Sequence, residues 1–533
     1  MIRTLFIGLD GATFTLLDVL TQPASDGEIV MPFLRSFIAG GTRAVLRSTP
    51  NPLTPPAWVS LMTGRWPGQH GVFDFLRVAE QNGEGFTTLY DARDIRVETI
   101  WAIASRQQQR VAALNFPITA PPRPVNGFLL PGFVPWKHLR RNSYPESLYE
   151  RLKALDGFNP KELAWDFERE NQSLDDLSET ECEAWVGYHL PREEQWFRVA
   201  RHLLASEQPD LMAVMFDGTD KIQHQAWRFL ESALVSSDPS PWERRMRALC
   251  LRYFRQLDQY LEQLVALAGP KAQVFMASDH GFTHSTEVVR INRYLYEKGY
   301  LYWKSSDGSE QFTRREASAF FTHLDWKKTL AYCHTPSSNG ITIRIARHPG
   351  EPGIAAADYP AFRARLIGDL ETLCDPHSGE RIIRAIRTRE EAFPGPAMHQ
   401  APDLLLTLRD FGFVSIKNLE PVVLPRPYPV GTHHPEGIFL AAGPGIVAGQ
   451  RGEPCDIVDV AATLLYSLGL EIPEDLEGRT PEAFFTAEQR VAHPIRQGAP
   501  TLPVADGTRQ AVEASAAEKA KIIEQLHMLG YME

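Results

Sequence analysis

Short apolar runs recur along the chain and alternate with longer segments in which apolar residues follow a helical spacing. Strands covered on both faces show continuous apolar runs, which is typical of a parallel sheet between helices. The predicted strands are Thr4–Leu9, Arg110–Asn115, Leu211–Phe216, Gln273–Ala277, Leu404–Leu408 and Gly437–Ala442. Apolar residues at three- and four-residue spacing predict helices over Glu193–Ala205, Trp242–Ala268 and Ile457–Leu468. The pattern predicts an α/β fold in which helices cover a mostly parallel central sheet.

The predicted elements divide the chain into a core and inserted segments. One discontinuous catalytic α/β core is predicted from residues 1–75, 200–285 and 400–485. Residues 76–199 are rich in Pro, Arg and aromatic residues, and we interpret them as an insertion that covers the active site. Residues 286–399 contain strand candidates of their own and are predicted to form a lid or cap. Residues 486–533 are predicted to comprise a linker and a C-terminal helix over Gln510–Leu529.

Composition and charge narrow the classes of function. The formal charge is −11, from 55 Lys and Arg and 66 Asp and Glu residues. We therefore expect no binding of nucleic-acid polymers, which needs many exposed cations. The five cysteines are scattered without CxxC spacing, which argues against a cysteine zinc site or a disulfide framework. We find no membrane span or signal peptide and expect a cytoplasmic protein. The oligomeric state stays open.

Acidic residues and histidines lie next to several predicted strands. They are Asp10, Asp220, His224, Asp279, His280 and His433. Ligands of open α/β sheets bind outside the carboxyl ends of the strands, so we expect most of these side chains to converge. Asp and His are ligands of zinc, and also of manganese or iron. Each pair alone also fits a solvated helix face or a polar turn.

The segment around Thr54 predicts the start of a helix. Thr54 fits the N-cap position, and Pro55 fits the first helical position. In one interpretation Thr54 only caps the helix. In the other, its hydroxyl is a nucleophile at the helix N-terminus, where metal coordination lowers its pKa enough to provide an alkoxide.

Several short motifs follow one another in a specific order. They are Asp10-Gly11, Thr54, Thr63-Gly64, Pro67-x-x-His70-Gly71, Asp220-x-x-x-His224, Asp279-His280-Gly281 and Gly431-x-His433. This order resembles the alkaline phosphatase superfamily, and more narrowly the type I phosphodiesterase/nucleotide pyrophosphatase family. The resemblance implies a three-layer α/β/α sandwich with inserted lid segments. It also implies a metal-dependent hydrolase of small phosphorylated substrates that cleaves phosphodiester or pyrophosphate bonds through a phospho-Thr54 intermediate.

The resemblance further implies two divalent metal ions, zinc or manganese. One ion would be held by Asp10, Thr54, Asp279 and His280, and the other by Asp220, His224 and His433. His434 is an alternative to its neighbour His433, although the family spacing favours His433. We expect Asp217 to orient a ligand from the second layer and His70 to be structural.

Two positions depart from the family pattern. An Asn that contacts phosphate in the nucleotide pyrophosphatases is replaced by Phe75, and Pro55 offers no backbone N–H after the nucleophile. The candidates that would contact substrate instead are Asn115, Arg65 and Lys221. One alternative is a phosphomonoesterase or phosphomutase-like enzyme on the same metal platform. Another is a metal-binding or interaction protein without catalysis.

Overall fold

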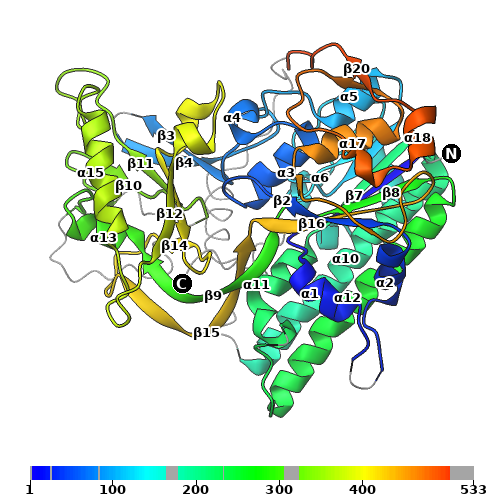
Figure 1. Cartoon of the computed structure of the whole chain (residues 1–533), viewed down its shortest axis with the longest axis horizontal. Coiled ribbons are helices and arrows are strands. Elements are labelled where there is room, and N and C mark those ends of the chain that lie inside the picture. Colours follow the sequence, from blue (N-terminus) through cyan, green and yellow to red (C-terminus); the bar gives the residue numbers. More distant parts are fainter. Residues whose placement is uncertain are drawn as a thin grey trace.

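A central sheet, flanked on both faces by helices, forms the larger part of the molecule (Figure 1). The computed structural model describes residues 3–24, 27–81, 84–163, 178–231, 233–304, 323–335 and 337–504. In spatial order the strands are β17 (Gln450–Arg451), β2 (Thr42–Arg47), β16 (Glu436–Ala442), β8 (Gln273–Ala277), β1 (Thr4–Leu9), β7 (Leu211–Phe216), β5 (Val111–Leu114) and β6 (Gly127–Leu130), and β18 (Cys455–Asp456) also pairs with β2.

The direction of β16 brings distant segments to one edge of the sheet. β1 pairs in parallel with β7 and β8, whereas β16 runs antiparallel to β2 and β8. Because β16 is reversed, its first residues lie at the edge where β1, β7 and β8 end. The segment before Glu436 therefore reaches the same edge as the segments that follow Leu9, Phe216 and Ala277.

Alternate residues of β1 belong to two separate hydrophobic cores, one on each face of the sheet. Leu5, Ile7 and Leu9 lie in the first core and Phe6 lies in the second. The first layer contains α1 (Phe14–Leu20), α2 (Pro32–Ala39), α10 (Glu179–Glu207), α11 (Gly218–Leu230) and α12 (Pro241–Ala268). The second layer contains α3 (Thr54–Thr63), α5 (Ile100–Arg106) and α17 (Asp459–Ser467). This arrangement confirms the predicted three-layer α/β/α fold.

A second lobe with its own hydrophobic core lies beside the sandwich (Figure 1). Its four-stranded sheet has the order β10 (Ala331–Tyr332), β11 (Gly340–Ile343), β13 (Leu404–Leu408) and β12 (Ile383–Thr388). Helices α13 (Ile291–Glu297) and α15 (Tyr359–Glu371) contribute to the same core.

Two long antiparallel strands connect the sandwich with the second lobe (Figure 1). They are β9 (Gly281–Arg290) and β15 (Val423–His434), with the short β14 (Val414–Ser415) beside β9. β9 begins directly after His280, and β15 ends at His434. The connection between the lobes therefore starts among the predicted metal ligands.

The predicted lid, residues 286–399, is shorter than the observed second lobe. Leu404–Leu408 forms a strand, but β13 pairs with β11 and β12 in the second lobe and not within the central sheet. A buried apolar run predicts a strand without indicating its sheet, because its partners are distant in the sequence.

The predicted insertion, residues 76–199, contributes to the central sheet. β5 and β6 are strands of that sheet, and α10 begins inside the segment at Glu179. β5 corresponds to the predicted strand Arg110–Asn115, whereas the four-residue β6 was not predicted. The hairpin of β3 (Leu76–Gln81) and β4 (Glu84–Leu89) also lies in this segment.

After the last core helix the chain forms α18 (Ala487–Ala492) and β20 (Arg496–Gly498), which pairs with β19 (Glu471–Pro473). The predicted helix Gln510–Leu529 lies outside the described residues. Within the described residues, no helix combines the length and apolar character that crossing a membrane requires.

Candidate metal centre

Two groups of buried side chains meet at the carboxyl edge of the central sheet. The first is Asp220, His224 and His433, and the second is Asp10, Asp279 and His280. Within each group the potential ligand atoms lie within 4.8 Å of one another. His280 Nε2 lies 3.8 Å from Asp220 Oδ1, so the two groups adjoin. The structure thus brings together all six Asp and His residues that the sequence predicts as ligands.

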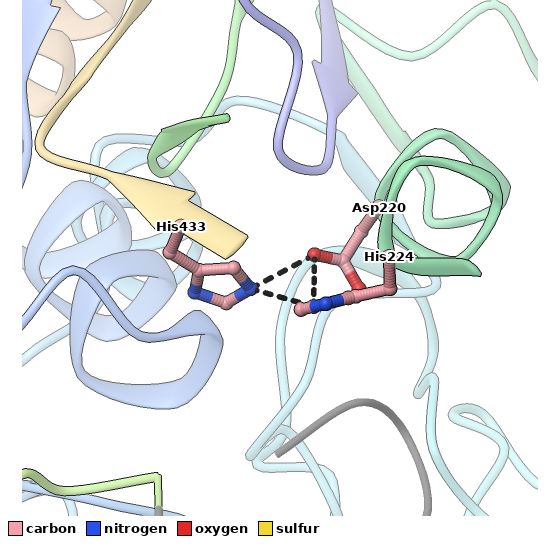
Figure 2. A group of neighbouring side chains, drawn as sticks. All are labelled: Asp220, His224 and His433. Atoms are coloured by element: carbon pink, nitrogen blue, oxygen red, sulfur yellow. Dashed lines mark hydrogen bonds and ion pairs between the residues drawn. The ribbon is translucent and has the colours of Figure 1, made fainter. Parts of the chain in front are cut away.

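The first group joins α11 to the end of β15. Asp220 and His224 lie one turn apart on α11 and face His433 (Figure 2). His433 Nε2 lies 2.9 Å from His224 Nε2 and 3.1 Å from Asp220 Oδ1. The i, i+4 spacing places both α11 side chains on one helix face, as expected.

The three histidines are oriented by backbone carbonyls. The Nδ1 atoms of His433 and His224 lie 2.7 Å from Pro52 O and 3.3 Å from Gly431 O, respectively. His280 Nδ1 lies 3.1 Å from the carbonyl of the next residue. A carbonyl oxygen only accepts hydrogen bonds, so in the neutral rings Nδ1 carries the proton and Nε2 presents its lone pair. Three lone pairs directed at one centre are the arrangement of metal-ligating histidines.

The second group combines two carboxylates with His280. Asp279 Oδ1 accepts a hydrogen bond of 3.1 Å from Gly11 N, and Asp10 Oδ2 accepts one of 3.4 Å from Trp58 Nε1. Within the described residues, the other oxygens, Asp10 Oδ1 and Asp279 Oδ2, accept no hydrogen bond although they are buried. They lie 3.6 Å and 3.3 Å from His280 Nε2. Buried oxygens without donors fit a cation as their partner.

The electrostatics of the two groups differ. Burial, followed by repulsion from Asp279, raises the pKa of Asp10 well above its ordinary value, and burial raises the pKa of Asp279 to about 8. Burial alone would raise the pKa of Asp220, but contacts with His224 and His433 hold that pKa well below the usual range. Burial lowers the pKa of His280. The carboxyls of the second group are therefore short of positive charge, which a bound metal ion would supply.

Thr54 lies beside the second group at the start of α3. Its Oγ1 atom is 3.5 Å from His280 Nε2, and all ten residues of α3 are buried. The helix starts one residue earlier than predicted: Leu53 is the N-cap, with extended backbone angles, and Thr54 is already helical. Cap positions assigned from sequence commonly shift by one residue. The Thr54 side chain is thus directed at the centre and does not cap the helix.

The first turn of α3 offers few N–H groups to an anion. Pro55 and Pro56 have no backbone N–H, and Ala57 N donates to Leu53 O at 3.0 Å. The prolines remove donors that would otherwise be buried without partners at this helix end. An anion beside Thr54 would therefore depend mainly on cations for stabilisation.

A buried ion cluster lies behind α11. Asp217, the N-cap of α11, accepts hydrogen bonds from Arg192 Nη1 at 2.5 Å and Asn115 Nδ2 at 3.2 Å. Lys221 Nζ lies 3.6 Å from the second oxygen of Asp217. Two predicted substrate contacts, Asn115 and Lys221, therefore lie together at Asp217. These contacts fix the start of the helix that carries Asp220 and His224.

The third predicted substrate contact, Arg65, is not brought to the centre. It follows Gly64, the C-cap of α3, at the opposite end of the helix from Thr54, and pairs with Asp475. Ten helical residues span about 15 Å, so Arg65 is too distant to contact a group at Thr54. Proximity of Arg65 to Thr54 in sequence does not translate into proximity in space, because the intervening segment is a helix.

The other histidines of the predicted motifs have partners outside the centre. His70 contacts Ser60 Oγ at 2.9 Å, and its Nδ1 accepts a bond of 3.1 Å from Val72 N. Burial lowers the pKa of His70 to about 3. His434 accepts from Glu436 N through Nδ1 at 3.2 Å, so His433 and not His434 faces the ligands.

Sequence reasoning missed Trp58 and Arg192, which contact Asp10 and Asp217. A tryptophan inside an apolar helix and an arginine inside a long helix carry no local signal of such a role. Their positions depend on the packing of α3 and α10 against the sheet.

Comparisons with known proteins identify a family and agree with the fold. The family model for type I phosphodiesterase / nucleotide pyrophosphatase matches residues 4–436. Human ectonucleotide pyrophosphatase / phosphodiesterase 5 aligns with a TM-score of 0.51 at 13% identity, covering 91% of this chain and 100% of that chain. An inactive form of the murine protein in complex with AMP aligns with a TM-score of 0.50 at 13% identity, covering 88% and 96%.

A phosphonoacetate hydrolase from Sinorhizobium meliloti 1021, in complex with phosphonoacetate, aligns with a TM-score of 0.48 at 16% identity, covering 88% and 95%. No curated protein matches the sequence significantly.

Proposed function

Because the chain belongs to the type I phosphodiesterase/nucleotide pyrophosphatase family, it is a hydrolase of phosphoric esters, and we propose that it cleaves phosphodiester or pyrophosphate bonds of small substrates through a phospho-Thr54 intermediate. The observation that carries this proposal is the position of Thr54 Oγ1 beside two adjoining groups of Asp and His side chains. The first group would hold one divalent ion, and the second group, with Thr54, would hold another. Zinc and manganese both suit this donor set.

The residues around Thr54 divide the work of phosphoryl transfer. Divalent ions in the two groups would supply Lewis-acid charge that lowers the pKa of the Thr54 hydroxyl and offsets the phosphoryl charge. Thr54 Oγ1 attacks phosphorus, the ester or anhydride oxygen leaves, and water then hydrolyses phospho-Thr54. His280, His224 and His433 keep their Nδ1 protons on carbonyls, so their orientation persists through both displacements. The buried position of Thr54 limits competing attack by bulk water.

A paired assay tests the substrate class. The full chain is loaded with zinc or manganese and assayed with bis-p-nitrophenyl phosphate and p-nitrophenyl phosphate. We expect faster turnover of the diester. Preference for the monoester would instead support the phosphomonoesterase alternative, and no turnover of either compound by the metal-loaded protein would contradict the proposed function.

Thr54→Ala tests the nucleophile. We expect turnover to fall by about 10³-fold or more, because the covalent route is lost, while Asp and His ligands still retain metal. Thr63→Ala is the matched control, since Thr63 is a buried threonine of the same helix whose hydroxyl donates to Val59 O at 2.7 Å. Acid quenching during turnover should trap a phosphorylated peptide that contains Thr54. Full activity of Thr54→Ala would show that the nucleophile is assigned wrongly.

A further inference from the structure

A buried carboxylate joins the second lobe to the sandwich. Asp74 lies in the turn after α4 (Pro67–His70) and is only 2% exposed. Its oxygens accept hydrogen bonds from Thr335 Oγ1 and from Ser337 Oγ, the latter at 2.9 Å. Both donors belong to the second lobe, between β10 and β11. Neither the metal ligands nor the proposed nucleophile accounts for this carboxylate.

The same lobe segment contacts the loop that leads to the nucleophile. Asn51 Nδ2 donates to Ser337 O at 3.4 Å, and Leu53 N donates to Asn51 O at 2.8 Å. Pro52 O, between them, accepts from His433 Nδ1 at 2.7 Å. The loop before Thr54 is therefore held by a predicted metal ligand on one side and by the second lobe on the other.

The lobe segment is anchored in its own lobe as well. Asn339 Nδ2 donates to Gly412 O at 3.1 Å, and its Oδ1 accepts from Val414 N at 2.9 Å. Cys333 N donates to Asn292 Oδ1 at 2.8 Å. Both ends of the segment are fixed to the second lobe. Its hydrogen bonds to Asp74 therefore connect the whole lobe, and not only one loop, to the sandwich.

We propose that Asp74 is a positioning residue: its carboxylate holds Thr335 and Ser337 so that the second lobe fixes the loop that leads to Thr54. We name Asp74, Thr335, Ser337 and Asn51 the lobe latch. The latch acts on catalysis only through the placement of Thr54, so this role rests on the proposed function. A displacement of about 1 Å in a reacting group can lower a rate about 100-fold, so even a small shift of the loop that leads to Thr54 has a measurable effect.

Titration of Asp74 makes the latch depend on pH, whereas an apolar packing contact does not. Burial raises the pKa of Asp74 to about 6, against hydrogen bonds that favour the ionised form. The titratable groups that face Asp74 keep their charge state around pH 6. Burial lowers the pKa of His334 to about 4 and raises that of Cys333 to about 12, and burial also raises the pKa of Tyr90. Below about pH 6 the protonated carboxyl is a poorer acceptor, and the latch loosens.

A neighbouring apolar contact between the lobes can be compared with the latch, because it does not titrate. Phe73 packs edge to face on Phe393 of the second lobe, with ring centroids 5.3 Å apart. This contact carries no charge, so it holds the lobes together equally above and below pH 6. The latch therefore changes the placement of one loop without separating the lobes.

The test compares Asp74→Asn with Asp403→Asn in the metal-loaded full chain. Asp403 is a matched buried aspartate of the second lobe whose carboxylate accepts from Ile343 N and Tyr359 Oη, both of the same lobe, at 2.6 Å each. For Asp74→Asn we expect kcat on bis-p-nitrophenyl phosphate to fall about 10- to 100-fold with little change in KM. The fall of kcat below about pH 6 should also be lost. Asp403→Asn should keep the wild-type pH profile.

A double-mutant cycle and hydrogen exchange complete the test. Thr335→Val by itself should lower kcat, but it should add little to Asp74→Asn, because both variants weaken the same hydrogen bond. Independently of turnover, Asp74→Asn should raise amide exchange in the peptide that contains Asn51 and Leu53, whereas Asp403→Asn should not. An active Asp74→Asn enzyme with wild-type kcat and pH profile overturns the latch. Unchanged amide exchange in that peptide also overturns the latch, and this readout does not depend on turnover. Failure of the wild type to hydrolyse either test ester would contradict the proposed function and not the latch.

Discussion

At the scale of single residues, two adjacent histidines provide a direct test of the ligand set. His433→Asn removes a nitrogen that lies 3.1 Å from Asp220 Oδ1, so we expect loss of one metal ion and a fall in turnover of about 100-fold or more. His434→Asn is the matched control, because this ring packs on Phe411 outside the centre. Metal content and turnover are measured on both variants. The assignment is contradicted if His434→Asn loses the metal and His433→Asn retains it.

The sequence predicted which six Asp and His side chains converge, but not what orients them. Asp220 and His224 share a local spacing, and Asp279 and His280 are adjacent, so their grouping was accessible from the chain. Pro52 O, which fixes the ring of His433, has no side-chain chemistry to reveal it. Such contacts depend on how distant segments pack, which spacing along one chain does not encode.

At the scale of elements, the start of α11 depends on the ion cluster at Asp217. Asp217→Asn deprives two buried cations, Arg192 and Lys221, of their shared carboxylate. We expect the free energy of unfolding to fall by about 3 kcal/mol or more, together with weaker metal binding through Asp220. Urea unfolding and metal titration measure the two effects. Arg192→Met should lower the free energy of unfolding by less, because Lys221 still neutralises Asp217. An equal or larger loss of unfolding free energy would contradict this role of the ion cluster at Asp217.

The existence of an element was predicted well where its apolar run was long. The sheet to which a strand belongs was predicted less well, because it depends on the neighbouring strands. β1, β7, β8 and α12 match the sequence pattern closely, since periodicity is a local property. β13 has an equally clear run but joins the second lobe, and the short β5 and β6 lie in a segment read as an insertion. Sheet membership is a long-range property, so the boundaries of residues 76–199 and 286–399 could not be fixed from the pattern.

At the scale of the whole molecule, the strands that connect the two lobes begin and end at the predicted metal centre. β9 leaves the sandwich directly after His280, and β15 returns to it at His433 and His434. The second lobe is therefore attached by the same strands that position two predicted ligands, His280 and His433. The lobe is therefore connected to the predicted metal centre through β9 and β15 as well as through the lobe latch.

Metal binding should also govern how the stability of the whole protein responds to pH. Burial raises the pKa values of Asp279 and Glu193 to about 8, above the ordinary carboxyl range. The folded protein therefore binds these protons more tightly than the unfolded chain, and stability falls as pH rises through the folded values. Between about pH 7 and about pH 8.5, the metal-free protein should lose about 1 kcal/mol of unfolding free energy for each group.

Urea unfolding in EDTA and in zinc separates the two contributions. A metal ion takes the place of the proton on Asp279 but not on Glu193, which instead accepts from Gly218 N and Tyr253 Oη. Zinc should therefore reduce the pH dependence, and Asp279→Asn should reduce it without metal. If the metal-free protein is equally stable at both pH values, neither carboxyl holds its proton as this structure requires. If zinc leaves the pH dependence unchanged, Asp279 does not bind the metal.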